Sequence, residues 1–168
     1  VVNLTVGKKK YADVEELMQE LLGKLQACQA DFLNLVDQDA KVFAPLAAAY
    51  ALPTSTEEEK QEKARIMEER LLAASLVPLH MMEKAEEMLG FLEILAEKGS
   101  RMAVSDVGVA VQFARTALTG AVMNVYINTK SMKNREKAEE LNEKANNLMK
   151  QGIRRADEIY ARVLEQLA

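Results

Sequence analysis

The sequence predicts an all-α fold, a bundle of about five long helices in a single domain that spans residues 1–168. Residues that favour helices, such as Ala, Leu, Glu, Lys and Met, are abundant, whereas three Pro and seven Gly leave little material for turns. Apolar residues recur at spacings of three and four over long stretches, which is the period of a helix with one buried face. A chain of 168 residues can bury a substantial core without cross-links.

The first helical pattern runs from about Ala12 to Tyr50. Pro45 lies near its end, where the missing N–H and the bulk of the ring should bend or break the last turns. The apolar face follows mostly at intervals of three or four residues: Leu17, Leu21, Leu25, Cys28, Phe32, Leu35 and Val36.

A second helix should begin after the connector at residues 52–55. Ser55 or Thr56 can cap it, and the three glutamates at 57–59 fall in its first turn, where the helix dipole favours negative charge. A residue that precedes proline is pushed out of the α region, so this helix should end before Pro78. Pro78 then suits the first turn of a third helix, which stops at Gly99.

A fourth, buried helix should follow, with Ser105 or Asp106 as its cap, and should reach about Thr129. Its apolar stretch is interrupted by Asp106, Gln112, Arg115 and Asn124, side chains that are costly in hydrocarbon, so it indicates a soluble core helix rather than a membrane span. A fifth helix, at about residues 134–167, has one apolar face: Leu141, Ala145, Leu148, Ile153, Ala156, Ile159, Tyr160 and Val163.

Charge and composition exclude several classes of function. The net charge of −4 argues against a nucleic-acid-binding protein, which needs clustered positive charge. Cys28 is the only cysteine, and no cluster of His, Cys and carboxylates suggests a metal site. His80 is the only histidine, and a lone His just inside a helix is more often an ordinary surface or core residue than a catalytic base. No signal peptide is recognisable, so a cytoplasmic location is the default expectation.

Asp39 is the strongest candidate for chemistry. A carboxylate on an apolar face is costly to bury unless it is paired, hydrogen-bonded or functional, and removal of water makes it a better proton acceptor. The alternative is a core aspartate satisfied by a distant partner. Asp37 lies on another side of the helix and has Lys41 within ion-pair reach. The residues three and four positions from Asp39 are all apolar: Leu35, Val36, Val42 and Phe43.

The fourth helix has two stripes. One is apolar and comprises Val107, Val111, Ala114, Leu118, Val122 and Val125. The other consists of small or polar residues, which permit close approach of a ligand or of another helix. Asn124 and Asn128 are one turn apart, so both can address one polar ring edge. The alternative, which the pattern alone favours, is that these amides bond to neighbouring backbone. For Asp106 the simplest role is the helix cap. The second stripe comprises Asp106, Ala110, Ala117, Gly120, Asn124 and Asn128.

A short basic run, Lys8 to Lys10, follows Gly7 near the start of the chain. It either holds an anionic tail, such as a glutamyl chain, or is a solvated segment before the first helix. The run is too short to specify phosphate, and neither a Walker pattern nor a GxGxxG motif is present.

Taken in order, several segments resemble the formiminotetrahydrofolate cyclodeaminase and methenyltetrahydrofolate cyclohydrolase family. The most specific are a VDxDA element at residues 36–40 and an SD…N…N helix at residues 105–128. Each segment is weak alone, but their order is specific and covers essentially the whole chain. The segments are GKKKY, LVDQDAKVF, EEEK after the connector with Pro53, SLVPL and SDVGVAVQFARTALTGAVMNVYIN.

The resemblance implies an all-helical homodimer with a folate cleft and no cofactor beyond the tetrahydrofolate-derived substrate. It implies that Asp39 is the acid/base residue, that the cleft includes Ser105, Asp106, Asn124 and Asn128, and that Lys8 and Lys9 meet the glutamate tail. Members of the family usually begin with a Gly-rich segment and a small-residue helix before an NLT-like element. This chain starts at that element, so we expect the first helix of the family, and part of the pocket, to be absent from it.

By this resemblance the expected reaction is that of a cyclodeaminase, which converts 5-formiminotetrahydrofolate to 5,10-methenyltetrahydrofolate and ammonia. The alternative is a cyclohydrolase, which opens the methenyl ring to 10-formyltetrahydrofolate. A third alternative, from another class, is a non-catalytic helical dimerisation scaffold in which Asp39 is a structural ion. Neither nucleic acid nor membrane is expected as a partner.

Overall fold

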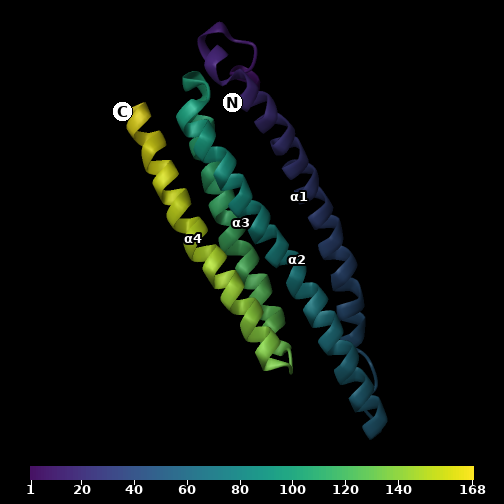
Figure 1. The fold of residues 1–168 in the computed structure, drawn as a ribbon. Coiled ribbons are helices and arrows are strands. Elements are labelled where there is room, and N and C mark those ends of the chain that lie inside the picture. Colours follow the sequence, from purple (N-terminus) through teal and green to yellow (C-terminus); the bar gives the residue numbers. More distant parts are fainter.

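The computed structural model describes all 168 residues and consists of long helices without strands (Figure 1). The all-α prediction is confirmed. Three short 3-10 helices, η1 (Val2–Leu4), η2 (Lys9–Val14) and η3 (Arg101–Ala103), lie before α1 and before α3. The four long helices are α1 (Glu15–Tyr50), α2 (Glu57–Lys98), α3 (Val104–Ser131) and α4 (Arg135–Leu167).

The second helix, α2, is the centre of the bundle. It packs against each of the other three long helices, and α3 and α4 also pack on each other. Helix α1 packs mainly against α2, and it lies on one side of α2 while α3 and α4 lie on the other (Figure 1). Both chain termini lie at the end of the bundle where α2 ends and α3 begins. One flank of α1 and one of α3 therefore have no covering helix.

The predicted break at Pro78 is wrong, which leaves four long helices instead of five. Helix α2 continues through Pro78, and the proline ring is buried in the core. Proline has no N–H for the carbonyl of Ala74, one turn earlier. That carbonyl accepts a hydrogen bond from Asn128 Nδ2 at 2.9 Å instead. Pro45 does not break its helix either, because α1 continues to Tyr50 with the proline on its exposed side.

The starts of α2 and α4 agree with the sequence, whereas the start of α3 does not. Thr56 caps α2 in a capping box with Glu59: its hydroxyl accepts from the Glu59 N–H at 3.2 Å, and the Glu59 carboxylate accepts from the Thr56 N–H at 3.1 Å. Asn134 caps α4 through the N–H of Lys137. The predicted cap of α3 is wrong, because η3 leads directly into α3 and Ala103 is the capping residue, without a side-chain bond.

The core is a continuous apolar layer around α2. The apolar stripe predicted for α3, from Val107 to Val125, is buried as expected. No helix combines the length and the apolar character that crossing a membrane requires. The largest fully buried side chains include Met18, Leu21, Leu71, Leu79, Met82, Leu89, Leu118 and Ile159.

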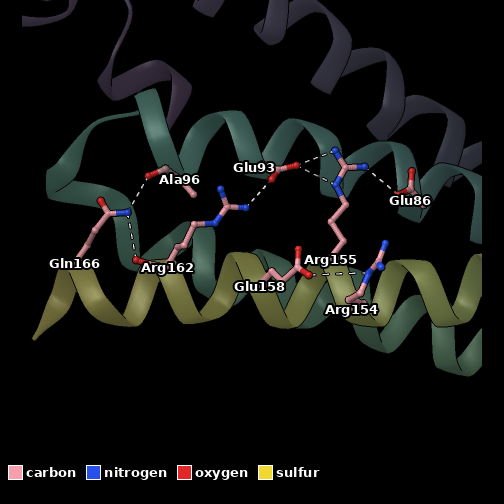
Figure 2. Close-up of polar contacts among 8 residues, drawn as sticks. All are labelled: Glu86, Glu93, Ala96, Arg154, Arg155, Glu158, Arg162 and Gln166. Carbon is pink, nitrogen blue, oxygen red and sulfur yellow. Dashed lines mark hydrogen bonds and ion pairs between the residues drawn. The ribbon is translucent and has the colours of Figure 1, made fainter.

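An ion-pair network joins α4 to α2 (Figure 2). Arg155 lies between Glu86, at 2.9 Å, and Glu93, at 3.0 Å, and Arg162 contacts the other Glu93 oxygen at 2.6 Å. Hydrogen bonds from Arg162 and then from Arg155 hold the pKa of Glu93 below its usual value. Positions 86 and 93 lie about 200° and 180° around α2 from Lys84, which contacts Asp31 of α1, so this network fixes α4 on the side of α2 away from that contact.

Candidate functional site

A cavity of about 300 Å³ with entirely apolar walls lies between α1 and α3 over α2. We use the word groove for the space between α1 and α3 along α2, of which this cavity is one part. Phe32 comes from α1, Met88 from α2 and the remaining lining residues from α3. A small uncharged ligand fits such a space better than a charged one, because no polar group in the cavity can replace the hydration of a charge. The lining residues are Phe32, Met88, Ala110, Phe113, Ala114 and Ala117.

Asp39 does not line this cavity but lies two turns farther along α1, on the side that bears Phe32, which forms the α1 wall of the groove. Val36, Asp39 and Phe43 follow Phe32 at intervals of four, seven and eleven residues, which places all four on one side of the helix. Val36 is 60% exposed and Phe43 is 62% exposed. Asp39 is exposed as well. The dry surroundings that its neighbours suggested are therefore not formed by one chain alone, and that expectation is corrected.

Asp37 does not join this wall. It is exposed on another side of α1, as predicted, but it makes no ion pair with Lys41. A different acidic residue of α1 forms an ion pair with α2: Asp31 contacts Lys84 at 2.8 Å. Hydrogen bonds to Asp31 and then to Glu87 raise the pKa of Lys84. This pair holds α1 to α2 close to Phe32.

Asn124 and Asn128 do not line the cavity either but lie farther along α3, on the side that forms the α3 wall of the groove. They follow Ala117 at intervals of seven and eleven residues, so the three share a side of α3. Asn124 is exposed, and Asn128 is half-buried with its bond to the Ala74 carbonyl. The bond to neighbouring backbone that the pattern favoured is thus present for Asn128 and absent for Asn124.

Two contacts with α2 place Asp39 and Asn128 at nearly the same height. Asp31 pairs with Lys84, and eight residues farther along α1 is Asp39, which brings it opposite position 76 of the antiparallel α2. Asn128 meets α2 at Ala74. Two residues correspond to about 3 Å of helix, so Asp39 and Asn128 lie at nearly the same height along α2, one on α1 and the other on α3.

The other predicted site residues lie at the far end of the bundle. Asp106 precedes Asn124 by eighteen residues, about 27 Å of helix. Ser105 and Asp106 are exposed in the first turn of α3. Ser105 lines a second cavity of about 400 Å³ between α3 and α4, together with Tyr160. The predicted residues therefore form two groups, one toward the end of α3 with Asp39, Asn124 and Asn128, and one at its start.

Lys8 and Lys9 belong to the group at the start of α3. Both are exposed. The segment that carries them is tied to the start of η3 by two hydrogen bonds: Tyr11 accepts from the N–H of Arg101 at 3.1 Å, and Thr5 accepts from the N–H of Ser100 at 2.9 Å. The lysines thus stand beside the end of the bundle where α3 begins.

Phe113 does not stand out in the sequence, yet it belongs to both cavities and is 72% exposed. The one feature of the sequence that could have pointed to Phe113 is the size of its side chain. It is the one large aromatic side chain inside the stripe of small residues on α3.

Comparisons with known proteins agree on one family. Residues 1–147 match the family model described as formiminotransferase-cyclodeaminase. A methenyltetrahydrofolate cyclohydrolase from Methylorubrum extorquens is 39% identical over 140 residues, which cover 83% of this chain and 67% of that protein. A formimidoyltransferase-cyclodeaminase from Mus musculus is 34% identical over 132 residues, 79% of this chain but only 24% of that much longer protein.

The fold also has a close neighbour among solved structures. The crystal structure of a formiminotetrahydrofolate cyclodeaminase from Thermotoga maritima superposes with a TM-score of 0.79 over 99% of this chain and 77% of that one. The sequence identity is 24%, so this likeness concerns the fold.

Proposed function

The chain belongs to the formiminotransferase-cyclodeaminase family, and from this premise we propose that it is a folate one-carbon enzyme. The first candidate reaction is the hydrolysis of 5,10-methenyltetrahydrofolate to 10-formyltetrahydrofolate, because the relative with 39% identity is named a cyclohydrolase. The second is the cyclodeaminase reaction, which the name of the mouse relative supports.

The observation that carries the proposal is the position of Asp39. The apolar row of α1 that includes Val36, Phe43 and Tyr50 contains this one acidic side chain, at the height of Asn128 on α3. A flat pterin in the groove would cover the apolar side chains and exclude water from the carboxylate. A desolvated carboxylate beside the reacting carbon is a suitable general base.

In the hydrolytic reaction, water attacks the methenyl carbon and gives one proton to the Asp39 carboxylate. The product is a tetrahedral carbon bonded to nitrogen 5, nitrogen 10 and a hydroxyl. The bond to nitrogen 5 then breaks, nitrogen 5 takes the proton from Asp39, and the hydroxyl proton leaves to solvent as the formyl group forms. The net reaction consumes one water and releases one proton.

In the cyclodeaminase reaction, nitrogen 10 attacks the carbon of the protonated formimino group, whose nitrogen carries two hydrogens, and loses its own proton to Asp39. The tetrahedral carbon now carries an amino group, which receives that proton and leaves as ammonia. The groove contributes by holding nitrogen 10 against the carbon, because fixed orientation replaces a bimolecular encounter. Both reactions need only the substrate, water and a proton carrier, so the proposal includes no cofactor and no metal.

The two groups of polar residues suggest how a folate would lie. We propose that the pterin lies between Asp39 and the two asparagines. The glutamate tail then extends toward the end of the bundle, where Lys8 and Lys9 are available as cations and Ser105 and Asp106 form the edge. A flexible anionic tail is held well by exposed lysines, since neither partner has to be buried.

We also propose that the chain works as a homodimer. Isolated exposed apolar side chains are normal, but a row of them on each of two helices favours an interface. Mass measurement by light scattering tests this, and a monomer at all accessible concentrations would contradict it. The large apolar side chains that are exposed on α1 and α3 are Leu33, Val36, Phe43, Tyr50, Val109, Phe113, Met123 and Ile127.

A paired assay tests the function. Loss of methenyl absorbance with 5,10-methenyltetrahydrofolate identifies the cyclohydrolase, and ammonia release from 5-formiminotetrahydrofolate identifies the cyclodeaminase. A thermal-shift measurement with 5-formyltetrahydrofolate accompanies both assays, because a ligand that binds the native state raises the melting temperature. A chain without turnover and without a shift would be the helical scaffold.

A further inference from the structure

Pro78 determines which way the Asn128 carboxamide points. The carbonyl of Ala74 has no helical donor, because the residue four positions later is a proline. Asn128 Nδ2 fills that place at 2.9 Å. A carbonyl only accepts hydrogen bonds, so the amide nitrogen, and not the amide oxygen, must face it. The orientation of this side chain is therefore set by a residue on another helix.

The other half of the carboxamide is free. No side chain or backbone N–H donates to Asn128 Oδ1, and no buried side-chain oxygen or nitrogen in the protein lacks a partner. Asn128 is only half-buried. Its Oδ1 is therefore accessible to solvent, as an acceptor with a fixed direction and no partner in the protein.

We propose that Pro78 is a positioning residue that holds Asn128 with its Oδ1 toward the groove, where that oxygen accepts a hydrogen bond from an N–H of the pterin ring. The inference rests on the proposed function, since it names the group of the folate that this position reads. A tetrahydropterin carries N–H donors on both of its rings, and an acceptor edge placed here would meet an oxygen and be rejected. The carboxamide thereby selects the way the ring enters the groove.

The test is Pro78→Ala, which restores an N–H for the Ala74 carbonyl. The helix gains its missing bond, so the melting temperature should stay the same or rise. Asn128 loses its exclusive partner and can rotate. We expect KM for 5,10-methenyltetrahydrofolate to rise about threefold to tenfold, the value of one ordinary hydrogen bond, with little change in kcat.

Pro45→Ala is the matched control. Pro45 also lies inside a helix, but no side chain donates to the carbonyl of Lys41, the residue four positions before it. This variant should leave KM unchanged. In the Asn128→Ala background, Pro78→Ala should have no further effect on KM, because the two residues act as one unit. If Pro78→Ala does not fold, Pro78→Ser, which also restores the N–H, takes its place.

A measurement without folate separates this inference from the proposed function. In the free protein, the side-chain amide protons of Asn128 should exchange with water more slowly than in Pro78→Ala, as seen by NMR. Equal exchange rates overturn the positioning role. An unchanged KM in a folded variant, or the same rise in KM without Asn128, overturns the role in binding. A wild-type protein that neither binds nor converts folates overturns the proposed function, and with it the assigned ligand, whatever the exchange rates are.

Discussion

Gly152 of α4 lies so close to Leu118 of α3 that a Cβ atom at position 152 would overlap a methyl group of the leucine. Leu118 is fully buried, and Gly152 is buried as well. The absence of a side chain on α4 thus sets how closely the two helices approach. Helix α3 carries one wall of the groove, so this contact also fixes where that wall stands.

Gly152→Ala should lower the free energy of unfolding by about 1 kcal/mol. Alanine gains about 1 kcal/mol over glycine in a helix, but overpacking a filled core typically costs about 1–3 kcal/mol. Urea denaturation followed by circular dichroism measures the change. The matched control is Gly23→Ala on α1, where nothing lies within 4 Å of an added Cβ and stability should rise. Equal shifts in both variants would contradict the close contact.

Glu93→Gln should destabilise the protein at neutral pH and have no effect in acid. The pKa of Glu93 is held below its usual 4.5 by Arg162 and Arg155, so its ion pairs contribute stability at every pH above 4.5. That contribution is lost as the pH falls through the lowered pKa of the folded protein. Melting temperatures from about pH 7 down to about pH 3 measure it, and the curves of wild type and variant should converge at the acid end.

Glu158→Gln supplies the comparison for this network (Figure 2). Glu158 is 4.0 Å from Arg154 on the same exposed face of α4. An exposed pair of this kind contributes little, so its removal should hardly change the melting temperature. A pH-independent loss in Glu93→Gln would mean that packing, and not charge, holds α4 to α2.

Local patterns predicted the helices well because their causes are local. The capping box at Thr56 and the apolar stripe of α3 depend on residues within a few turns, and both are present. Pro78 was misread for the opposite reason. Its missing hydrogen bond is replaced by Asn128, fifty residues farther along the chain, and no local pattern contains that information. A proline remains inside a helix when tertiary contacts offset its cost.

The site was predictable in residue type but not in surroundings. The apolar neighbours of Asp39 at helical spacing correctly marked an apolar face, yet half of that face stays open in one chain. Whether a face is covered depends on the other elements that pack on it, and the period of a single helix does not report that. The height match of Asp39 and Asn128 depends on the contact of Asp31 with Lys84, which joins two helices.

Lys8→Ala/Lys9→Ala should weaken binding of folates with several glutamates more than of those with one. Both lysines are exposed beside the end of the bundle, so they can meet an anionic tail there but not the pterin. Each removed charge contributes a screened attraction, and the difference between the two substrates should shrink as salt is added. KM for both substrates at low and high salt measures it. Lys150→Ala, an exposed lysine in the middle of α4, should affect neither substrate.

Asp39→Asn should keep the fold but lower kcat by about 10² to 10⁴, the usual effect of removing a general base. The amide has nearly the same shape as the carboxylate and cannot take up a proton. Circular dichroism and the melting temperature confirm the fold, and the paired assay measures turnover. Asp37→Asn is the matched control, because Asp37 is exposed, makes no ion pair, and lies two residues and about 200° away around α1. It should cost little, and full turnover in a folded Asp39→Asn would remove this carboxylate from the mechanism.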